Sequence, residues 1–458
     1  MKVLRSRKKM FFYACSAFGV NLLNLIMGSY LCSAIIAGGF SSENVANHTF
    51  EGHDLVIAGL WAVFAVVAKI IDGVIDIPMA SLTDRMKTRW GRRRPAILLG
   101  MIPMILAYVL FLVVPNKNEA TVGNTIYFFV MLALFYTSYT LTMVTYYATF
   151  TEIVDNEEDR RFITNVKSVC DIVYFIVGYV VVSMILKGFN VRIVALMMLP
   201  LVLTMLIPIF MIKENSTKNG VGEYEKTVNL FKSLGYTFKN KDFIVWMVVY
   251  SFMTFGLQLF LNGINEYFSI TGLSMILTMA SSFAPVPLTF IIYNKIIRKK
   301  GFRFAFQYVL LVFAFGMLSM FGISHLPAGT LRTILSIVCG LISSFSVGAL
   351  FAVAYSIPSQ LAADDEKRTG ISHSAMYFAV QGLFAGVASG IGGGAVLTLL
   401  KDTDMLFNHP GTFYITLISA IACVIAFVLT FILPQSIVNL GKQTDSKEEV
   451  KEQVTNEE

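Results

Sequence analysis

Long runs of apolar residues alternate with short polar connections along the whole chain. Each run is long enough to cross about 30 Å of hydrocarbon as a helix, which takes roughly 20 residues. A backbone in lipid must satisfy its own hydrogen bonds, so these runs are expected to be helical and the fold to be an all-α membrane protein. We predict about twelve membrane-spanning helices, at residues 11–38, 55–80, 95–114, 122–153, 162–187, 191–212, 242–266, 270–297, 303–324, 329–357, 371–400 and 411–433.

The connecting segments differ in charge from one side of the membrane to the other. Cations gather in the cluster 85–94, the pair 160–161, the linker 213–241 and the segment 295–303. The loop 39–54 contains no Lys or Arg. Because Lys and Arg concentrate in cytoplasmic loops, we predict a multi-pass protein of the cell membrane with both termini in the cytoplasm.

Composition supports a membrane protein and limits its partners. Of the 458 residues, 56% are hydrophobic and 14% are charged, whereas soluble domains carry about 25% charged residues. The net charge of +7 arises from short loops, so we expect membrane lipids around the chain and no nucleic-acid partner. The five cysteines fall in apolar runs without metal-type spacing and are interpreted as packing residues.

The chain also contains an internal repeat. The segment TEIVDNEEDRRFIT at 151–164 aligns with SQLAADDEKRTGIS at 359–372, and the cationic loops around Gly91 and Gly301 repeat at nearly the same offset. We therefore predict two six-helix pseudo-repeat bundles, an arrangement in which transporters bind substrate between the halves. The predicted parts are an N-terminal half at 1–212, a cytoplasmic linker at 213–241, a C-terminal half at 242–435 and a disordered tail at 436–458.

The second apolar run carries charged residues at membrane depth. Lys69, Asp72 and Asp76 follow one another at spacings of three and four, so they project from one helix face. An ionised carboxylate at the bilayer centre costs roughly 2.5 to 3.5 kcal/mol, so such groups face a partner, a cavity or an ion. Two carboxylates on one face favour a cation site. A structural ion pair between Lys69 and Asp72 is the alternative.

A dense cationic motif follows this run. The sequence DRMKTRWGRRR at 84–94 resembles the major facilitator signature of the loop between helices II and III. Together with the D-x-x-x-D spacing before it, RWGRRRP resembles the glycoside-pentoside-hexuronide:cation symporters, the family of the melibiose carrier. Weaker similarity at 13–21, 143–153 and 378–386 extends the resemblance over most of the chain.

The resemblance implies a role for this loop and for the charged helix before it. In the family the loop joins the cytoplasmic ends of the two halves, which implies a cytoplasmic latch; a topology signal alone is the alternative. The implied latch residues are Asp84, Arg85, Arg89 and Arg92.

The family's cation site consists of two helix II carboxylates, an asparagine and a helix IV threonine. The resemblance places this site at Asp72, Asp76 and Thr140, with Lys69 beside them, while the asparagine position is Ile75. A hard cation needs several oxygen ligands and a proton needs one carboxylate, so the coupling ion is either H⁺ or Na⁺. Asp72 and Asp76 would be metal ligands only in a sodium-coupled protein.

Several positions that contact sugar in the family carry other side chains here. The helix I acid is Asn21, the helix IV acid is Met143, the helix V arginine is Lys167 and the helix XI lysine is Gln381. Residues four apart on a helix face each other, so Lys167 and Asp171 either line the substrate path or satisfy each other. The candidate substrate contacts are Asn21, Tyr146, Lys167, Asp171 and Gln381.

These features predict a cation-coupled secondary active transporter, a symporter, of a small organic solute such as a glycoside or a related sugar derivative. The alternative keeps the fold with an amphiphilic, lipid-like or steroid-like cargo, or with export. A non-transporting membrane receptor is a third reading. The sequence has no nucleophile–base set and no phosphate-binding loop, so we predict no enzyme activity and no cofactor besides the coupling ion. We expect the protein to function as a monomer.

Overall fold

The computed structural model describes most of the chain. The described residues are 6–84, 86, 88–153, 157–212, 214, 238–369 and 374–438. Within them the secondary structure is helical apart from one isolated β-bridge between Leu406 and His409. The predicted all-α fold is therefore confirmed.

Elements before residue 213 are called the N-terminal helices. Several spans are built from two or three consecutive elements, because short π- or 3₁₀-helical stretches interrupt the α-helix. These elements are α1 (Arg7–Cys15), α2 (Phe18–Ile26), η1 (Met27–Leu31), α3 (Cys32–Ala34), α4 (Val45–His48), α5 (Ala58–Asp84), α6 (Arg93–Phe111), α7 (Val122–Glu152), α8 (Glu157–Ile176), η2 (Val177–Val181), α9 (Val182–Leu186), α10 (Val191–Met198), η3 (Leu199–Met205) and α11 (Leu206–Met211).

Elements after residue 238 are called the C-terminal helices. They are α13 (Lys241–Asn262), α14 (Ile264–Thr271), α15 (Met275–Phe283), α16 (Val286–Lys300), α17 (Phe302–Ser324), α18 (Thr330–Thr369), α19 (Ser374–Ser389), η4 (Gly390–Val396), α20 (Leu397–Asp402), η5 (Gly411–Tyr414), α21 (Ile415–Leu429), η6 (Thr430–Ile432) and α22 (Gln435–Val438).

The count of membrane spans agrees with the sequence. Eleven described helices are long and apolar enough to cross a membrane, and a bent pair brings the number to twelve. The bent pair is α15 and α16, which meet at 43°. Pro285 and Pro287 stand at the start of α16, and a proline lacks the N–H that would continue the helix. The predicted span 270–297 is therefore a broken helix.

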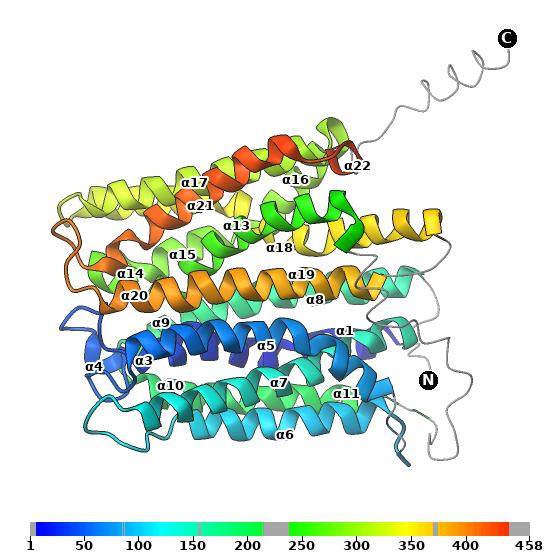
Figure 1. Ribbon diagram of the computed structural model, residues 1–458, viewed down its shortest axis with the longest axis horizontal. Helices are drawn as coiled ribbons and strands as arrows, with labels where there is room; N and C mark the ends of the chain where they lie inside the picture. Colours follow the sequence, from blue (N-terminus) through cyan, green and yellow to red (C-terminus); the bar gives the residue numbers. More distant parts are fainter. Residues whose placement is uncertain are drawn as a thin grey trace, which may run out of the picture.

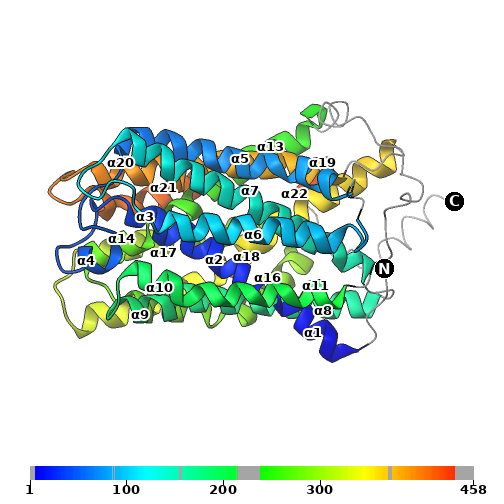
Figure 2. The same ribbon diagram turned by 90° about the horizontal axis from the view of Figure 1, so that it is seen from below.

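The spans run side by side (Figure 1), with the C-terminal helices drawn mainly above the N-terminal ones. α1 begins at the same end of the bundle where α22 lies, and we call this the terminal end. The opposite end, which carries α4, is called the distal end. Figure 2 shows α5, α6 and α7 next to one another, and α7 contacts both of the others.

The outward faces of the spans are apolar. On α6, Leu99, Ile102 and Leu106 are each about half exposed or more, at helical spacings of three and four. A helix that shows a continuous apolar stripe to its surroundings is solvated by lipid. The exposed stripe confirms that the chain is a multi-span membrane protein.

α5 packs tightly against α19 and η4 through small residues. Gly382, Gly386 and Gly390 recur every four residues, and a Cβ on Gly390 would lie 2.9 Å from Cα of Val66 on α5. Such spacing of glycines lets two helix backbones approach closely within a membrane. The charged face of α5 is thereby held against the C-terminal helices. The glycines of the run 392–394 also pack closely against other helices.

The two loops that repeat in the sequence share a backbone feature. Gly91 has a φ of 89° just before α6, and Gly301 has a φ of 83° just before α17. Non-glycine residues rarely adopt this left-handed conformation. At the start of α6, the backbone N–H of Arg93 donates to Oε2 of Glu214 at 2.8 Å, so a linker carboxylate caps this helix.

The division into two bundles at 1–212 and 242–435 stays a prediction.

Candidate cation and solute site

The predicted polar face of α5 meets α7 near the middle of the bundle. Nζ of Lys69 lies 3.4 Å from Oδ2 of Asp72, and Oγ1 of Thr140 on α7 donates to Oδ1 of Asp72 at 3.2 Å. The i, i+3 spacing on α5 puts the lysine next to the carboxylate, and the contact between α5 and α7 brings the threonine to its other oxygen. Three of the four predicted cation-site residues therefore form one cluster.

Lys69 has a second neighbour that the sequence reasoning missed. Its Nζ lies 3.8 Å from the centroid of the Tyr136 ring on α7, within the range of a cation–π contact. Tyr136 precedes Thr140 by four residues, so both project from the same face of α7. The four-residue spacing between Tyr136 and Thr140 is the sequence signal from which this neighbour of Lys69 could have been predicted.

Asp76 lies one helical turn beyond Asp72 and faces α19. A Cβ on Gly382 would lie 3.8 Å from Oδ2 of Asp76, so the carboxylate is at the boundary between the N-terminal and C-terminal helices. In the described part of the chain, no side chain donates a hydrogen bond to Asp76. Lys69, Asp72 and Asp76 together provide two carboxylates and one ammonium. A proton or a monovalent cation would remove this imbalance of charge.

Three predicted substrate contacts form a second polar network. Nδ2 of Asn21 on α2 donates to Oδ1 of Asp171 at 3.4 Å, and Tyr139 donates to Oδ1 of Asn21 at 3.1 Å. Lys167 forms an ion pair with Asp171 on α8 and lies over the Tyr147 ring at 5.0 Å. Lys167 and Asp171 therefore do satisfy each other, and they also connect to α2 and α7.

The other two predicted contacts, Tyr146 and Gln381, are buried side chains. Tyr146 is fully buried, and its hydroxyl donates to the carbonyl oxygen of Tyr13 at 2.6 Å, which ties α7 to α1. Gln381 is buried on α19 and accepts a hydrogen bond from Nε1 of Trp246 at 3.2 Å. The geometry gives both side chains packing partners, and their contact with solute stays a prediction.

The predicted latch falls largely outside the described residues. Arg85 and the side chain of Asp84 are not among them. Arg89 is exposed and Arg92 is half-buried just before α6. The latch therefore stays a prediction.

A buried ion pair at the distal end was missed by the sequence reasoning. Nζ of Lys401 on α20 lies 2.9 Å from Oε1 of Glu266 on α14, and the two side chains are 3% and 0% exposed. The same ammonium donates to the carbonyl oxygen of Ser33 on α3 at 2.8 Å and to its Oγ at 3.0 Å. The Ser33 hydroxyl in turn donates to Oε1 of Glu266. We call Ser33, Glu266 and Lys401 the distal cluster.

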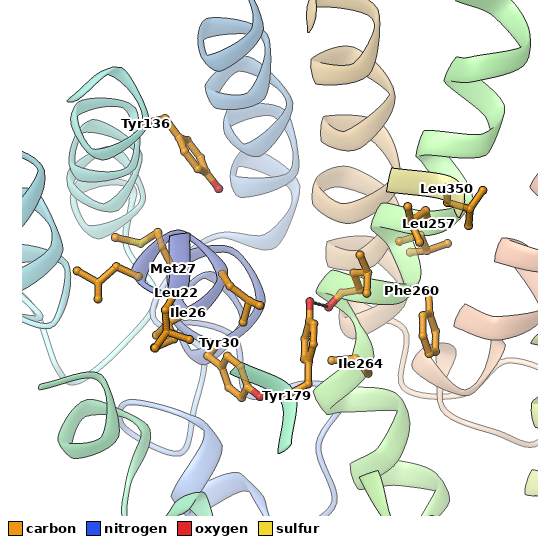
Figure 3. Packing of buried hydrophobic residues seen from close by; sticks show 14 of the residues in the cluster. Leu22, Ile26, Met27, Tyr30, Tyr136, Tyr179, Leu257, Phe260, Ile264 and Leu350 are labelled. Atoms are coloured by element: carbon orange, nitrogen blue, oxygen red, sulfur yellow. Dashed lines mark hydrogen bonds between the residues drawn. The ribbon is translucent and has the colours of Figure 1, made fainter. Parts of the chain in front are cut away.

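Further hydrogen bonds join N-terminal and C-terminal helices near the distal cluster. Nδ2 of Asn265 donates to the carbonyl oxygen of Ser29 at 2.7 Å, and the backbone N–H of Ser41 donates to Oγ of Ser269 at 3.0 Å. In Figure 3, Tyr179 of η2 lies between Tyr30 and Ile264 of α14. These contacts hold the distal ends of the two sets of helices together.

A small cavity, which we call the central cavity, lies between the group formed by Lys69, Asp72 and Thr140 and the distal cluster. Its volume is about 40 Å³, enough for a few water molecules. It is lined by Gly28, Cys32, Ser33, Ile36, Trp61, Ala65, Lys69, Leu132, Tyr136, Asn262, Ser389, Gly393, Gly394, Leu397, Thr398 and Lys401. Lys69 and Lys401 therefore line the same space between the N-terminal and C-terminal helices.

A twelve-span bundle with charged groups buried between its two sets of helices has the architecture of a secondary transporter. The chain belongs to the family described as MFS/sugar transport protein, whose model matches residues 12–438. The family consists of transporters, which confirms the prediction of a membrane transporter rather than an enzyme. The expected resemblance to cation symporters agrees with this family.

Curated relatives match parts of the chain. The putative glycoside/cation symporter YagG of Escherichia coli is 35% identical over 91 residues, which cover 20% of this chain and 19% of that protein. The lactose permease of Lactobacillus helveticus is 27% identical over 146 residues, which cover 31% of this chain and 21% of the permease. The matched segments span between 19% and 30% of the length of the curated relatives.

Solved structures share the fold. The nucleoside transporter NupG superposes with a TM-score of 0.62 at 13% identity, covering 94% of this chain and 99% of that one. A bacterial homologue of the iron transporter ferroportin in an inward-facing state has a TM-score of 0.61 at 11% identity, covering 94% and 99%. At such identity the likeness establishes the fold alone.

Proposed function

We propose that the protein is a cation-coupled symporter in which Asp72, Asp76 and Thr140 hold the coupling ion, H⁺ or Na⁺. The observation that carries the proposal is the unbalanced carboxylate pair on α5, one member of which faces the C-terminal helices without a hydrogen-bond donor among the described residues. Relatives named as symporters support it. The cargo is a small organic solute, and the matched lactose permease favours a sugar derivative.

Electrostatics explains how ion binding would drive the cycle. Two carboxylates one turn apart repel in a poorly solvated site, and Lys69 offsets one negative charge. A proton or sodium ion neutralises the remaining charge, so the N-terminal and C-terminal helices can pack across Asp76 with the solute enclosed. By linkage, an ion that raises solute affinity is itself bound more tightly when solute is present, by the same factor.

The distal cluster supports alternating access. It ties α3 to α14 and α20, so solute reaches the central cavity from the distal side only after these contacts break. We place the protein in the cell membrane as a monomer with both termini in the cytoplasm. In this orientation the distal end faces outward, and the halves at 1–212 and 242–435 rock against each other.

Gradient-driven uptake tests the proposal. Purified protein in sealed proteoliposomes is assayed against a panel of glycosides, glucuronides, steroids and lysolipids, with sodium and pH gradients imposed separately. Asp76→Asn is expected to retain solute exchange but to lose accumulation, whereas Asp72→Asn weakens both. Asp404→Asn, which changes an exposed distal carboxylate, is the matched control. Full gradient-driven accumulation by the Asp72→Asn, Asp76→Asn double mutant would refute the proposal.

A further inference from the structure

We infer that the solute carries a carboxylate or a comparable anionic group, and that Lys69 binds this group once the coupling ion occupies Asp72. The inference rests on the proposed symport function and assigns a chemical class to the solute. In this inference Lys69 is a solute-binding residue rather than a permanent part of the cation site, because ion binding releases it from Asp72.

The lining of the central cavity supports an anionic ligand. Two of its lining residues, Lys69 and Lys401, are lysines, and none is Asp or Glu. Asn262, Ser389 and Thr398 add amide and hydroxyl groups, and Trp61 adds an aromatic surface. The amide and hydroxyl groups both donate and accept, so the two ammonium groups are the feature of the lining that favours an anion over a neutral solute.

The two lysines differ in how well their charge is satisfied. Lys401 is 3% exposed and uses all three of its donors, one on Glu266 and two on Ser33, at 2.8 to 3.0 Å. Lys69 has one carboxylate contact at the longer distance of 3.4 Å, and its other neighbour is Tyr136, which it meets at the ring and at the hydroxyl. Lys69 is therefore the lysine with donors available to a ligand.

Ion binding at Asp72 changes the surroundings of Lys69. A proton on Asp72 removes its negative charge, and a sodium ion on its oxygens competes with the ammonium for them. Either event takes from Lys69 its carboxylate partner at bonding distance, because Asp76 lies one turn further along α5 and faces α19. A buried ammonium without a hydrogen-bonded partner is unfavourable in a site with little water. A solute anion entering the adjoining cavity takes the place of Asp72 as the partner of this ammonium. Each ligand thus favours the other, which is the requirement for coupled transport.

Gly28 of η1 keeps the cavity open beside this lysine. A Cβ on Gly28 would lie 3.7 Å from the Tyr136 hydroxyl oxygen and 3.8 Å from Oδ1 of Asn262. The glycine thus separates a residue of α7 from a residue of α13 across the cavity. A larger side chain here fills the space that the anionic group would take, and it leaves every charge in place.

Matched ligand pairs test the inference. Binding of glucuronate and glucose, gluconate and sorbitol, and lactate and propane-1,2-diol is measured by thermal stabilisation of the full-length protein at constant ionic strength, with sodium present and again at low pH. The anionic member of at least one pair is expected to bind at least tenfold more tightly than its neutral partner. Lys69→Met abolishes this preference and Lys69→Arg retains it. Lys187→Met, on an exposed lysine, leaves it unchanged.

Two further results keep the test decisive. If Lys69→Met does not fold, Gly28→Val takes its place and is expected to lose anion binding with Lys69 present. Equal binding of anionic and neutral members in every pair, or a preference that survives Lys69→Met, overturns the inference. Accumulation of a neutral solute that depends on Asp72 and Asp76 also overturns it while leaving symport intact. Accumulation that is independent of both carboxylates refutes the proposed function itself.

Discussion

Replacing Lys401 by Met removes the positive charge from the buried ion pair at the distal end. Methionine retains the length and the apolar stem of lysine, so the packing against α3 and α14 is largely preserved. Glu266, which is 0% exposed, then has no cation within bonding distance. Its Oε2 already lacks a hydrogen-bond partner, and Oε1 retains only the hydroxyl of Ser33.

The free-energy cost of Lys401→Met applies only to the state in which the distal end is closed. Breaking a buried ion pair from one side costs about 3–5 kcal/mol, because an uncompensated charge stays buried. The Ser33 hydroxyl still donates to Glu266, so we expect the lower end of this range. When the distal contacts open, water reaches Glu266 and the penalty largely disappears. The equilibrium between closed and open states therefore shifts toward open by roughly 10²-fold, since 1.4 kcal/mol corresponds to a factor of ten.

Alkylation of Cys32 measures this shift. Cys32 lines the central cavity and immediately precedes Ser33, so a reagent applied from the distal side reaches it after the distal contacts part. The other four cysteines are replaced by alanine. In sealed vesicles, the labelling rate with a small charged thiol reagent is expected to rise at least tenfold in Lys401→Met, while Lys187→Met serves as the control.

A double substitution provides the decisive comparison. Combining Lys401→Met with Glu266→Gln removes both charges, and a neutral pair of similar volume costs little in a buried site. The labelling rate should therefore return close to that of the parent protein. Unchanged labelling in Lys401→Met, or a double mutant that labels at least as fast as the single one, would refute the idea that the ion pair holds the distal end closed.

Three other substitutions probe other parts of the structure. A Cβ at Gly386 would lie closer than 3.0 Å to the Lys69 carbonyl oxygen, so Gly386→Val should reduce uptake at least tenfold, whereas Gly322→Val, with open space around it, should not. Burial lowers the pKa of His48, so the folded state disfavours the charged imidazole. The free energy of unfolding is therefore at its full value above the ordinary histidine pKa and decreases as the pH drops below that value. His48→Asn should make the melting temperature depend less on pH in this range. Gln381→Lys places an ammonium beside Trp246 without the acid that Met143 replaces, so melibiose uptake should not appear in a transport assay.

The sequence alone determined the membrane spans and the charged face of α5. Bilayer thickness sets the length of an apolar run, so the run 122–153 corresponds closely to α7 at Val122–Glu152. Helical periodicity likewise puts Lys69 beside Asp72, because residues three apart share a face whatever surrounds the helix. Both features depend on local geometry, which needs no knowledge of the neighbouring helices.

Only the tertiary structure decided which distant groups meet. Ser33, Glu266 and Lys401 come from three separate segments, and their contact depends on how α3, α14 and α20 rotate and cross. The same holds for Tyr136 over Lys69, which requires the packing of α7 against α5. Apolar runs specify that a helix spans the membrane but leave its rotation about its own axis open. Packing against neighbouring helices sets that rotation, so it decided the distal cluster, the cavity and the second neighbour of Lys69.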